Sequence, residues 1–134
     1  MNSILKTLSA VLMATFLSCS GQAQQGQGKA ENISTAAFSQ MIAQTEGVQL
    51  VDVRTPGEWE KGTLAGARRI NWMGNDFEIQ AAKLDTLKPV LIYCASGARS
   101  SKAIQKLNAM GFQEIYNLSG GIKAWEKAGL EVVK

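Results

Sequence analysis

One cysteine, Cys94, stands where this sequence could do nucleophilic chemistry. It directly follows the apolar run 89–93 and precedes small residues that lead into a helix. We therefore expect it at the carboxyl end of a strand, where open α/β sheets bind ligands. Gly97 lets the loop curl tightly, so that backbone N–H groups turn inward and, with the helix N-terminus, favour the thiolate or a bound sulfur anion. The alternative is a small buried hydrophobic residue.

The sequence contains no histidine, so a Ser-His-Asp or Cys-His arrangement within the chain is excluded. Its two cysteines, Cys19 and Cys94, are too few for a zinc-finger set, and we expect no metal. Activation of Cys94 is left to backbone dipoles or to a cation such as Arg99. The helix dipole does not favour an arginine on a first helical turn, which suggests that Arg99 holds an anion or closes the loop. The alternative is an ordinary surface side chain.

The elements around this loop alternate between strands and helices. Apolar runs and turn residues predict strands at 48–53, 67–71, 89–93 and 114–117, and helices at 34–45, 77–84, 100–110 and from 120 onward. Ser34 and Asp76 are the expected N-caps of two helices, and Gly111 is the expected end of a third. This alternation indicates an open α/β sheet with helices on both faces.

The N-terminal residues have the pattern of an export signal. Lys6 precedes a run of about ten mostly apolar residues, 8–17, which is short for a bilayer span. The alternative, a buried hydrophobic helix, is disfavoured by the Gln- and Gly-rich stretch that comes next. That stretch predicts a flexible linker over 20–30.

Two routes of processing fit this N-terminus. In one, the signal sequence in residues 1–19 is a lipoprotein signal that ends before Cys19, and Cys19 is lipidated as the new N-terminus; in the other, cleavage follows Ala23. The folded domain then covers 31–134. We expect an exported, periplasmic protein, with a lipid anchor in the membrane if the first route applies.

The charge of the chain gives no support for nucleic acid as a partner. The net charge is +3, and the basic residues are scattered apart from the pair Arg68 and Arg69. This pattern is typical of a solvated mixed surface. We expect a monomer.

Three motifs, in order, resemble the rhodanese family. Residues 94–100 (CASGARS) resemble its active-site loop, in which four residues separate a cysteine from an arginine that is followed by serine. Residues 50–54 (LVDVR), with Glu58, Gly62 and Gly66, resemble the family's Asp-Val-Arg segment, and residues 120–125 resemble its closing Gly-Gly and Trp element. Together the motifs cover almost the whole domain.

The resemblance implies a fold, an activity and a site. The fold is a rhodanese-like open parallel five-stranded sheet with helices on both faces. The activity is sulfur transfer without a metal or organic cofactor: a cysteine thiolate takes a sulfane sulfur from a donor such as thiosulfate. It then passes that sulfur, as a persulfide, to a thiophilic acceptor such as cyanide or a thiol.

When the family's roles are assigned to the matching residues of this sequence, Cys94 is the nucleophile, and Arg99 shapes the loop and holds the donor anion. The residues whose backbone N–H groups cradle the sulfur are Ala95, Ser96, Gly97, Ala98 and Arg99. Asp52, Arg54 and Glu58 would tie nearby loops through hydrogen bonds and ion pairs. The alternative for these three is that they are ordinary surface charges.

Departures from the family pattern leave further alternatives. Ala95 and Ala98 stand where many relatives carry basic or polar side chains, so the donor could be a persulfide-carrying protein, and the chain could be a sulfur carrier or binding module with little thiosulfate turnover. Thr63 replaces a common histidine at a position expected to be structural. A cysteine phosphatase or arsenate reductase is a further alternative, but those enzymes need one more loop residue to wrap a tetrahedral oxyanion.

Overall fold

The structure, a computed structural model, describes residue 26 and residues 28–134. The expected export signal at 1–19, its Cys19 and the cleavage site after Ala23 lie outside the described residues. Within the described part, no helix is long and apolar enough to cross a membrane.

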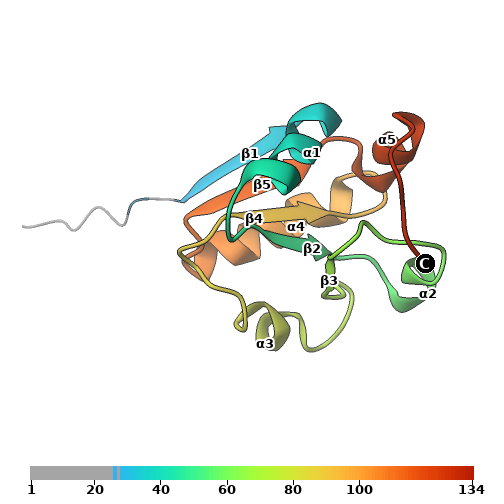
Figure 1. The fold of residues 1–134 in the computed structure, drawn as a ribbon. Coiled ribbons are helices and arrows are strands. Elements are labelled where there is room, and N and C mark those ends of the chain that lie inside the picture. The colour runs from blue at the N-terminus through green and yellow to red at the C-terminus, as the bar shows by residue number, and fades with distance from the viewer. Residues whose placement is uncertain (1–25, 27) are drawn as a thin grey trace, which may run out of the picture.

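Five parallel strands form one sheet, in the order β1-β5-β4-β2-β3 (Figure 1). The strands are β1 Lys29–Ile33, β2 Gln49–Asp52, β3 Arg68–Arg69, β4 Val90–Tyr93 and β5 Glu114–Leu118. The helices are α1 Thr35–Gln44, α2 Pro56–Trp59, α3 Phe77–Ala81, α4 Ala98–Ala109 and α5 Gly121–Lys127. The predicted α/β class with a five-stranded parallel sheet is confirmed.

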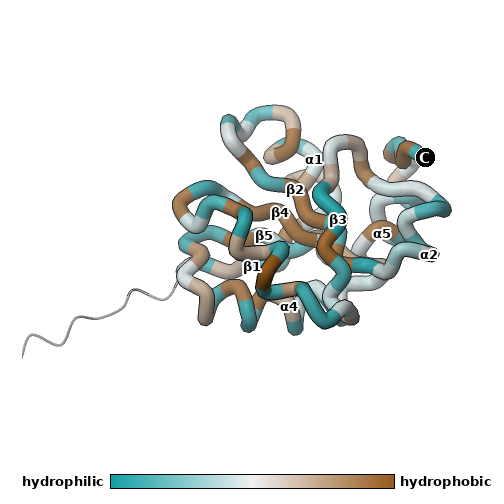
Figure 2. Tube along the Cα trace, turned by 90° about the horizontal axis from the view of Figure 1, so that it is seen from below, coloured by the Kyte–Doolittle hydropathy of each residue, from teal (hydrophilic) through white to brown (hydrophobic). Residues whose placement is uncertain are grey.

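The sheet separates two hydrophobic cores. Alternate residues of β4 point to opposite faces, as the pleat of a strand requires. Val90 and Ile92 join a core under α3 and α4, and Leu91 and Tyr93 join a core under α1 and α5. Figure 2 shows hydrophobic residues along the central strands and hydrophilic residues at many of the outer turns. Both faces of β4 are therefore buried, and the loop at its carboxyl end is attached to a strand that is packed on both sides.

The strand β1 was not predicted from the sequence. It lies at the edge of the sheet and pairs only with β5, from Lys29 opposite Glu114 to Ile33 opposite Leu118. Four of its five residues are exposed, so the apolar alternation that marks a strand is missing. β1 begins two residues before the expected domain start, and Lys29 and Ala30 of the expected linker belong to it.

Candidate active site

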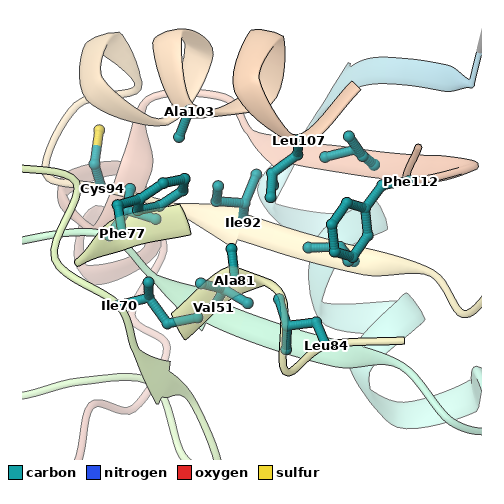
Figure 3. Close-up of a cluster of buried hydrophobic side chains, with 13 residues drawn as sticks. Val51, Ile70, Phe77, Ala81, Leu84, Ile92, Cys94, Ala103, Leu107 and Phe112 are labelled. Carbon is teal, nitrogen blue, oxygen red and sulfur yellow. The ribbon is translucent and has the colours of Figure 1, made fainter. Parts of the chain in front are cut away.

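Cys94 comes directly after the last residue of β4. The residue is 1% exposed and belongs to the core under α4, where Phe77 and Ala103 are also buried. Figure 3 shows its sulfur pointing away from the side chains of that core, toward the first turn of α4. The sulfur thus lies at the carboxyl ends of the strands, at the position predicted from the sequence.

The loop after Cys94 turns polar hydrogens toward the sulfur. Gly97 has φ +105°, a conformation that favours glycine, and its N–H donates to Cys94 Sγ at 3.0 Å. The Ser100 Oγ lies 3.4 Å from Sγ and 3.1 Å from the Gly97 carbonyl oxygen. Because Ser100 is fully buried, this hydroxyl has few other partners available, and it helps to surround the sulfur with donors.

These donors shift the pKa of the thiol. Burial raises the pKa of Cys94, but the Ser100 hydroxyl and the backbone N–H groups of Ser100, Ser96 and Gly97 lower it by more, so the pKa lies below its ordinary value. A thiolate stabilised without any histidine is what the sequence predicts. Ser100 was missed as a site residue, because the expected helix began at 100, whereas α4 begins at Ala98 and carries Ser100 in its first turn.

The helix α5 holds the carbonyl groups of the loop. The Ile122 N–H donates to the Cys94 oxygen at 2.9 Å, and the Lys123 N–H to the Ala95 oxygen at 3.2 Å. Because these carbonyl oxygens face α5, N–H groups of the loop can face the sulfur. The contact requires glycine at position 121, since a Cβ there would lie 2.5 Å from the Ala95 oxygen.

On the opposite flank, Arg99 forms a two-pronged ion pair with Glu58 of α2. Its Nη1 and Nη2 each donate to one of the Glu58 carboxylate oxygens at 2.7 Å. Glu58 also accepts the Thr55 N–H at 3.0 Å and the Thr55 hydroxyl at 2.8 Å. The bond from Arg99 outweighs partial burial and, with Thr55, lowers the pKa of Glu58 to about 2. The structure thus brings together Arg99 and Glu58, two residues predicted at the site for separate roles.

A second ion pair, between Asp52 and Arg54, is buried beneath the first. Asp52 is fully buried and Arg54 is 5% exposed. The Arg54 side chain donates to both Asp52 oxygens, at 2.7 to 3.1 Å, and to the Gly62 carbonyl oxygen at 2.7 Å. It also reaches the Glu58 carbonyl oxygen at 3.4 Å. The pair therefore joins the end of β2 to Glu58 in α2 and to Gly62 beyond the end of that helix, and neither residue is an ordinary surface charge.

The remaining loop residues border a cleft of about 360 Å³ on the β1 side. It is lined by Asn32, Ser96, Gly97, Ala98, Ser101, Asn117, Ser119 and Gly120, all of them uncharged. The described residues contain no group of three or more His, Cys, Asp or Glu side chains that could hold a metal ion.

The family profile described as "Rhodanese-like domain" matches residues 34–128. The chain belongs to the rhodanese-like domain family. The match takes in the cysteine loop and Glu58, so the two flanks of the site lie inside the rhodanese-like domain.

Relatives of this rhodanese-like domain agree with the assignment. A protein named sulfurtransferase from Allochromatium vinosum is 39% identical over 101 residues, which cover 75% of this chain and 92% of the relative. The thiosulfate sulfurtransferase GlpE of Shewanella oneidensis is 34% identical over 94 residues, covering 69% and 91% of the two chains. The crystal structure of a rhodanese-like domain protein from Staphylococcus aureus has a TM-score of 0.66 at 30% identity and covers 78% of this chain and 99% of that one.

Proposed function

We propose that this protein is a sulfurtransferase in which Cys94 carries a sulfane sulfur as a persulfide. The observation that supports this most directly is the thiol itself, whose pKa is lowered by the Gly97 N–H and the Ser100 hydroxyl beside Sγ. A thiolate is the nucleophilic form of cysteine, and donors fixed around it also suit a persulfide anion.

The first half of the reaction loads sulfur on Cys94. With thiosulfate as donor, the Cys94 thiolate attacks the outer sulfur of thiosulfate and forms a new S–S bond. The S–S bond of thiosulfate breaks, and sulfite leaves with its electron pair. Cys94 then carries a terminal sulfur with one negative charge, and no proton has to be transferred.

The second half of the reaction regenerates the Cys94 thiolate. A thiophilic acceptor, cyanide or the thiolate of a second substrate, attacks the terminal sulfur and forms thiocyanate or a new persulfide. The bond between the two sulfurs on Cys94 breaks, and its electron pair returns to Sγ. The same donors that favour the thiolate make it a good leaving group in this step.

A sulfur carrier with little thiosulfate turnover is a second candidate, and two observations favour it. Arg99, the single cation of the loop, has its charge paired with Glu58 through Nη1 and Nη2. The cleft beside the loop is lined by uncharged residues. Both features weaken attraction for a dianion and suit a neutral or protein-bound persulfide as donor.

Intact mass spectrometry of the purified full chain after thiosulfate treatment tests the proposal. We expect a gain of one sulfur atom, mapped to Cys94 by proteolysis and lost in Cys94→Ser. Thiosulfate loading without fast thiocyanate formation from cyanide would favour the carrier. No gain with either thiosulfate or an alkyl persulfide, under conditions in which a known sulfurtransferase loads, would exclude sulfur transfer through Cys94.

We also propose that the protein is exported, on the sequence pattern of residues 1–23 alone. Fractionation of expressing bacterial cells is expected to recover it outside the cytoplasm. If Cys19 is lipidated, Cys19→Ser should move the protein from the membrane fraction to the soluble one. Recovery of the unprocessed wild-type chain in the cytoplasm would contradict export.

A further inference from the structure

Asn117 is a buried polar residue on β5 that plays no part in the sulfur transfer proposed for Cys94. It is 2% exposed and shares a sheet face with Ile115, which belongs to the core under α4. Its Nδ2 donates to Asn32 Oδ1 at 2.9 Å and to Ser101 Oγ at 3.3 Å. Its Oδ1 has no hydrogen-bond partner among the described residues, which costs stability. A buried amide kept at such a cost needs an explanation beyond packing.

Ser101 extends this network to the cysteine loop. Its hydroxyl donates to the Gly97 carbonyl oxygen at 2.7 Å, and its backbone N–H to the same oxygen at 3.1 Å. A serine hydroxyl has one proton, and the bond to Gly97 uses it. The lone pairs of the oxygen are left to accept the Asn117 N–H. The amide therefore fixes the direction in which the Ser101 hydroxyl points.

Gly97 links this network to the sulfur. Its carbonyl oxygen accepts its shortest hydrogen bond from the Ser101 hydroxyl and lies 3.1 Å from the Ser100 hydroxyl, while its own N–H donates to Cys94 Sγ. Gly97 has a φ of +105°, which glycine adopts readily, and it has no side chain that could restrain its backbone. The two peptide groups that meet at Gly97 therefore need contacts with other residues to hold their orientation. We propose that Asn117 and Ser101 are positioning residues for Cys94, which fix the Gly97 backbone in the conformation that aims its N–H at Sγ.

The inference rests on the proposed function only in taking Cys94 as the nucleophile. It makes a prediction that a purely structural role does not share. Removal of the Asn117 amide should reduce the reactivity of Cys94 without reducing the stability of the fold, because an unpaired buried oxygen is removed as well. Since the Gly97 N–H is one of the groups that lower the pKa of Cys94, a misaligned Gly97 should raise that pKa.

The test is the pH dependence of alkylation of Cys94 by iodoacetamide. The full chain carries Cys19→Ser in every sample, so that Cys94 is its single thiol. The variants are Asn117→Leu, which keeps the approximate shape of the side chain, and Ser101→Ala, at an exposed position. The charged groups beside the loop, Arg99 and its partner Glu58, are unchanged in both variants.

We expect alkylation near neutral pH to slow several-fold in both variants and its pH midpoint to rise, with no lower thermal midpoint of unfolding in Asn117→Leu. Ser101→Thr keeps a hydroxyl at this position and should therefore be alkylated at the wild-type rate, unlike Ser101→Ala. The double variant should be no slower than the slower single one, since both act through Gly97. Ser119→Ala, which lines the same cleft outside this network, is the matched control and should alkylate as the wild type does.

An unchanged pH profile in Ser101→Ala would overturn the inference, even if Asn117→Leu failed to fold. Equal loss of stability and reactivity in Asn117→Leu, with Ser101→Ala unaffected, would also overturn it in favour of a structural role. Sulfur loading is read separately: if the wild type loads no sulfur but the alkylation profiles shift as expected, the proposed function fails and the positioning role stands.

Discussion

The two flanks of the cysteine loop are held by different kinds of interaction. On the α2 flank, the Arg99–Glu58 ion pair fastens the loop, above the buried pair of Asp52 and Arg54. On the flank facing β5 and α5, the contacts are neutral, namely backbone N–H groups of α5 on the Cys94 and Ala95 oxygens and the hydroxyl of Ser101 on Gly97.

The difference separates two tasks. The charged flank sets where the loop sits relative to α2, and removing one charge of the buried Asp52–Arg54 pair leaves the other unpaired. The neutral flank sets which way the peptide groups of the loop face, and therefore which of them reach the sulfur. Substitutions on the charged flank should show mainly in stability, and those on the neutral flank should show in the reactivity of the thiol as well.

The largest effect is expected for Arg54→Met. Asp52 is left as an uncompensated buried carboxylate, and we expect a loss of about 3–5 kcal/mol in the free energy of unfolding. Urea denaturation at pH 7 measures it. Asp52→Asn combined with Arg54→Met removes both charges and should lose less than Arg54→Met alone. A loss below about 1 kcal/mol in the single variant would mean that water still reaches the pair and screens it.

On the neutral flank, Gly121→Ala should be the most disruptive change. The φ of +62° at position 121 is strained for alanine, and its Cβ would meet the Ala95 oxygen at 2.5 Å. We expect a loss of about 2–4 kcal/mol and slower alkylation of Cys94. Gly111→Ala is the matched control, because its φ is +92° with nothing within 4 Å of the new Cβ. That variant should show the backbone strain alone, about 1–2 kcal/mol. Equal losses in the two variants would argue against close packing of α5 on the loop.

Glu58→Gln should lose about 1 kcal/mol at pH 7, since its ion pair with Arg99 is partly exposed and screened. Because folding lowers the pKa of Glu58 from about 4.5 to about 2, the carboxylate stabilises the fold above pH 4.5 and loses this contribution as the pH falls through 2. The difference in unfolding free energy between wild type and Glu58→Gln should therefore shrink between pH 4.5 and 2. Urea titrations at a series of pH values measure it; a difference that grows in acid would contradict the assignment.

The smallest effect on stability is expected for Ser100→Ala, within about 1 kcal/mol. Its effect on chemistry should be clear, because the Ser100 hydroxyl is one of the groups that lower the pKa of Cys94. The pH midpoint of iodoacetamide alkylation should rise, and the rise should persist in high salt, since a neutral donor is not screened. An alkylation profile that matches the wild type would remove Ser100 from the site.

The sequence predicted the features that depend on neighbours along the chain. The apolar run 89–93 became β4, and the helix expected at 100–110 is α4, Ala98–Ala109. Cys94 and the small residues after it were enough to predict a loop of inward N–H groups. These features are local, because strand length, glycine and helix periodicity determine them over a few residues.

Features that depend on contacts between distant residues were not predicted. β1 has no apolar pattern of its own and is a strand because β5 lies beside it. Arg99 and Glu58 are 41 residues apart, and the sequence could nominate each but could not show that they pair. Asn117 likewise looks like an ordinary strand residue until Ser101 of α4 is placed against it.

The direction of β1 has a practical consequence. All five strands run the same way, so the chain enters the sheet at Lys29, at the end opposite to Cys94 (Figure 1). The strands between these ends are about 15 Å long. Attachment to a bead, a sensor chip or a lipid surface through the chain just before Lys29 would therefore hold the domain at the end of the sheet opposite to Cys94. Immobilisation through that end should leave the loop around Cys94 open to large partners, whereas a bulky tag near Gly97 or Gly120 should obstruct them.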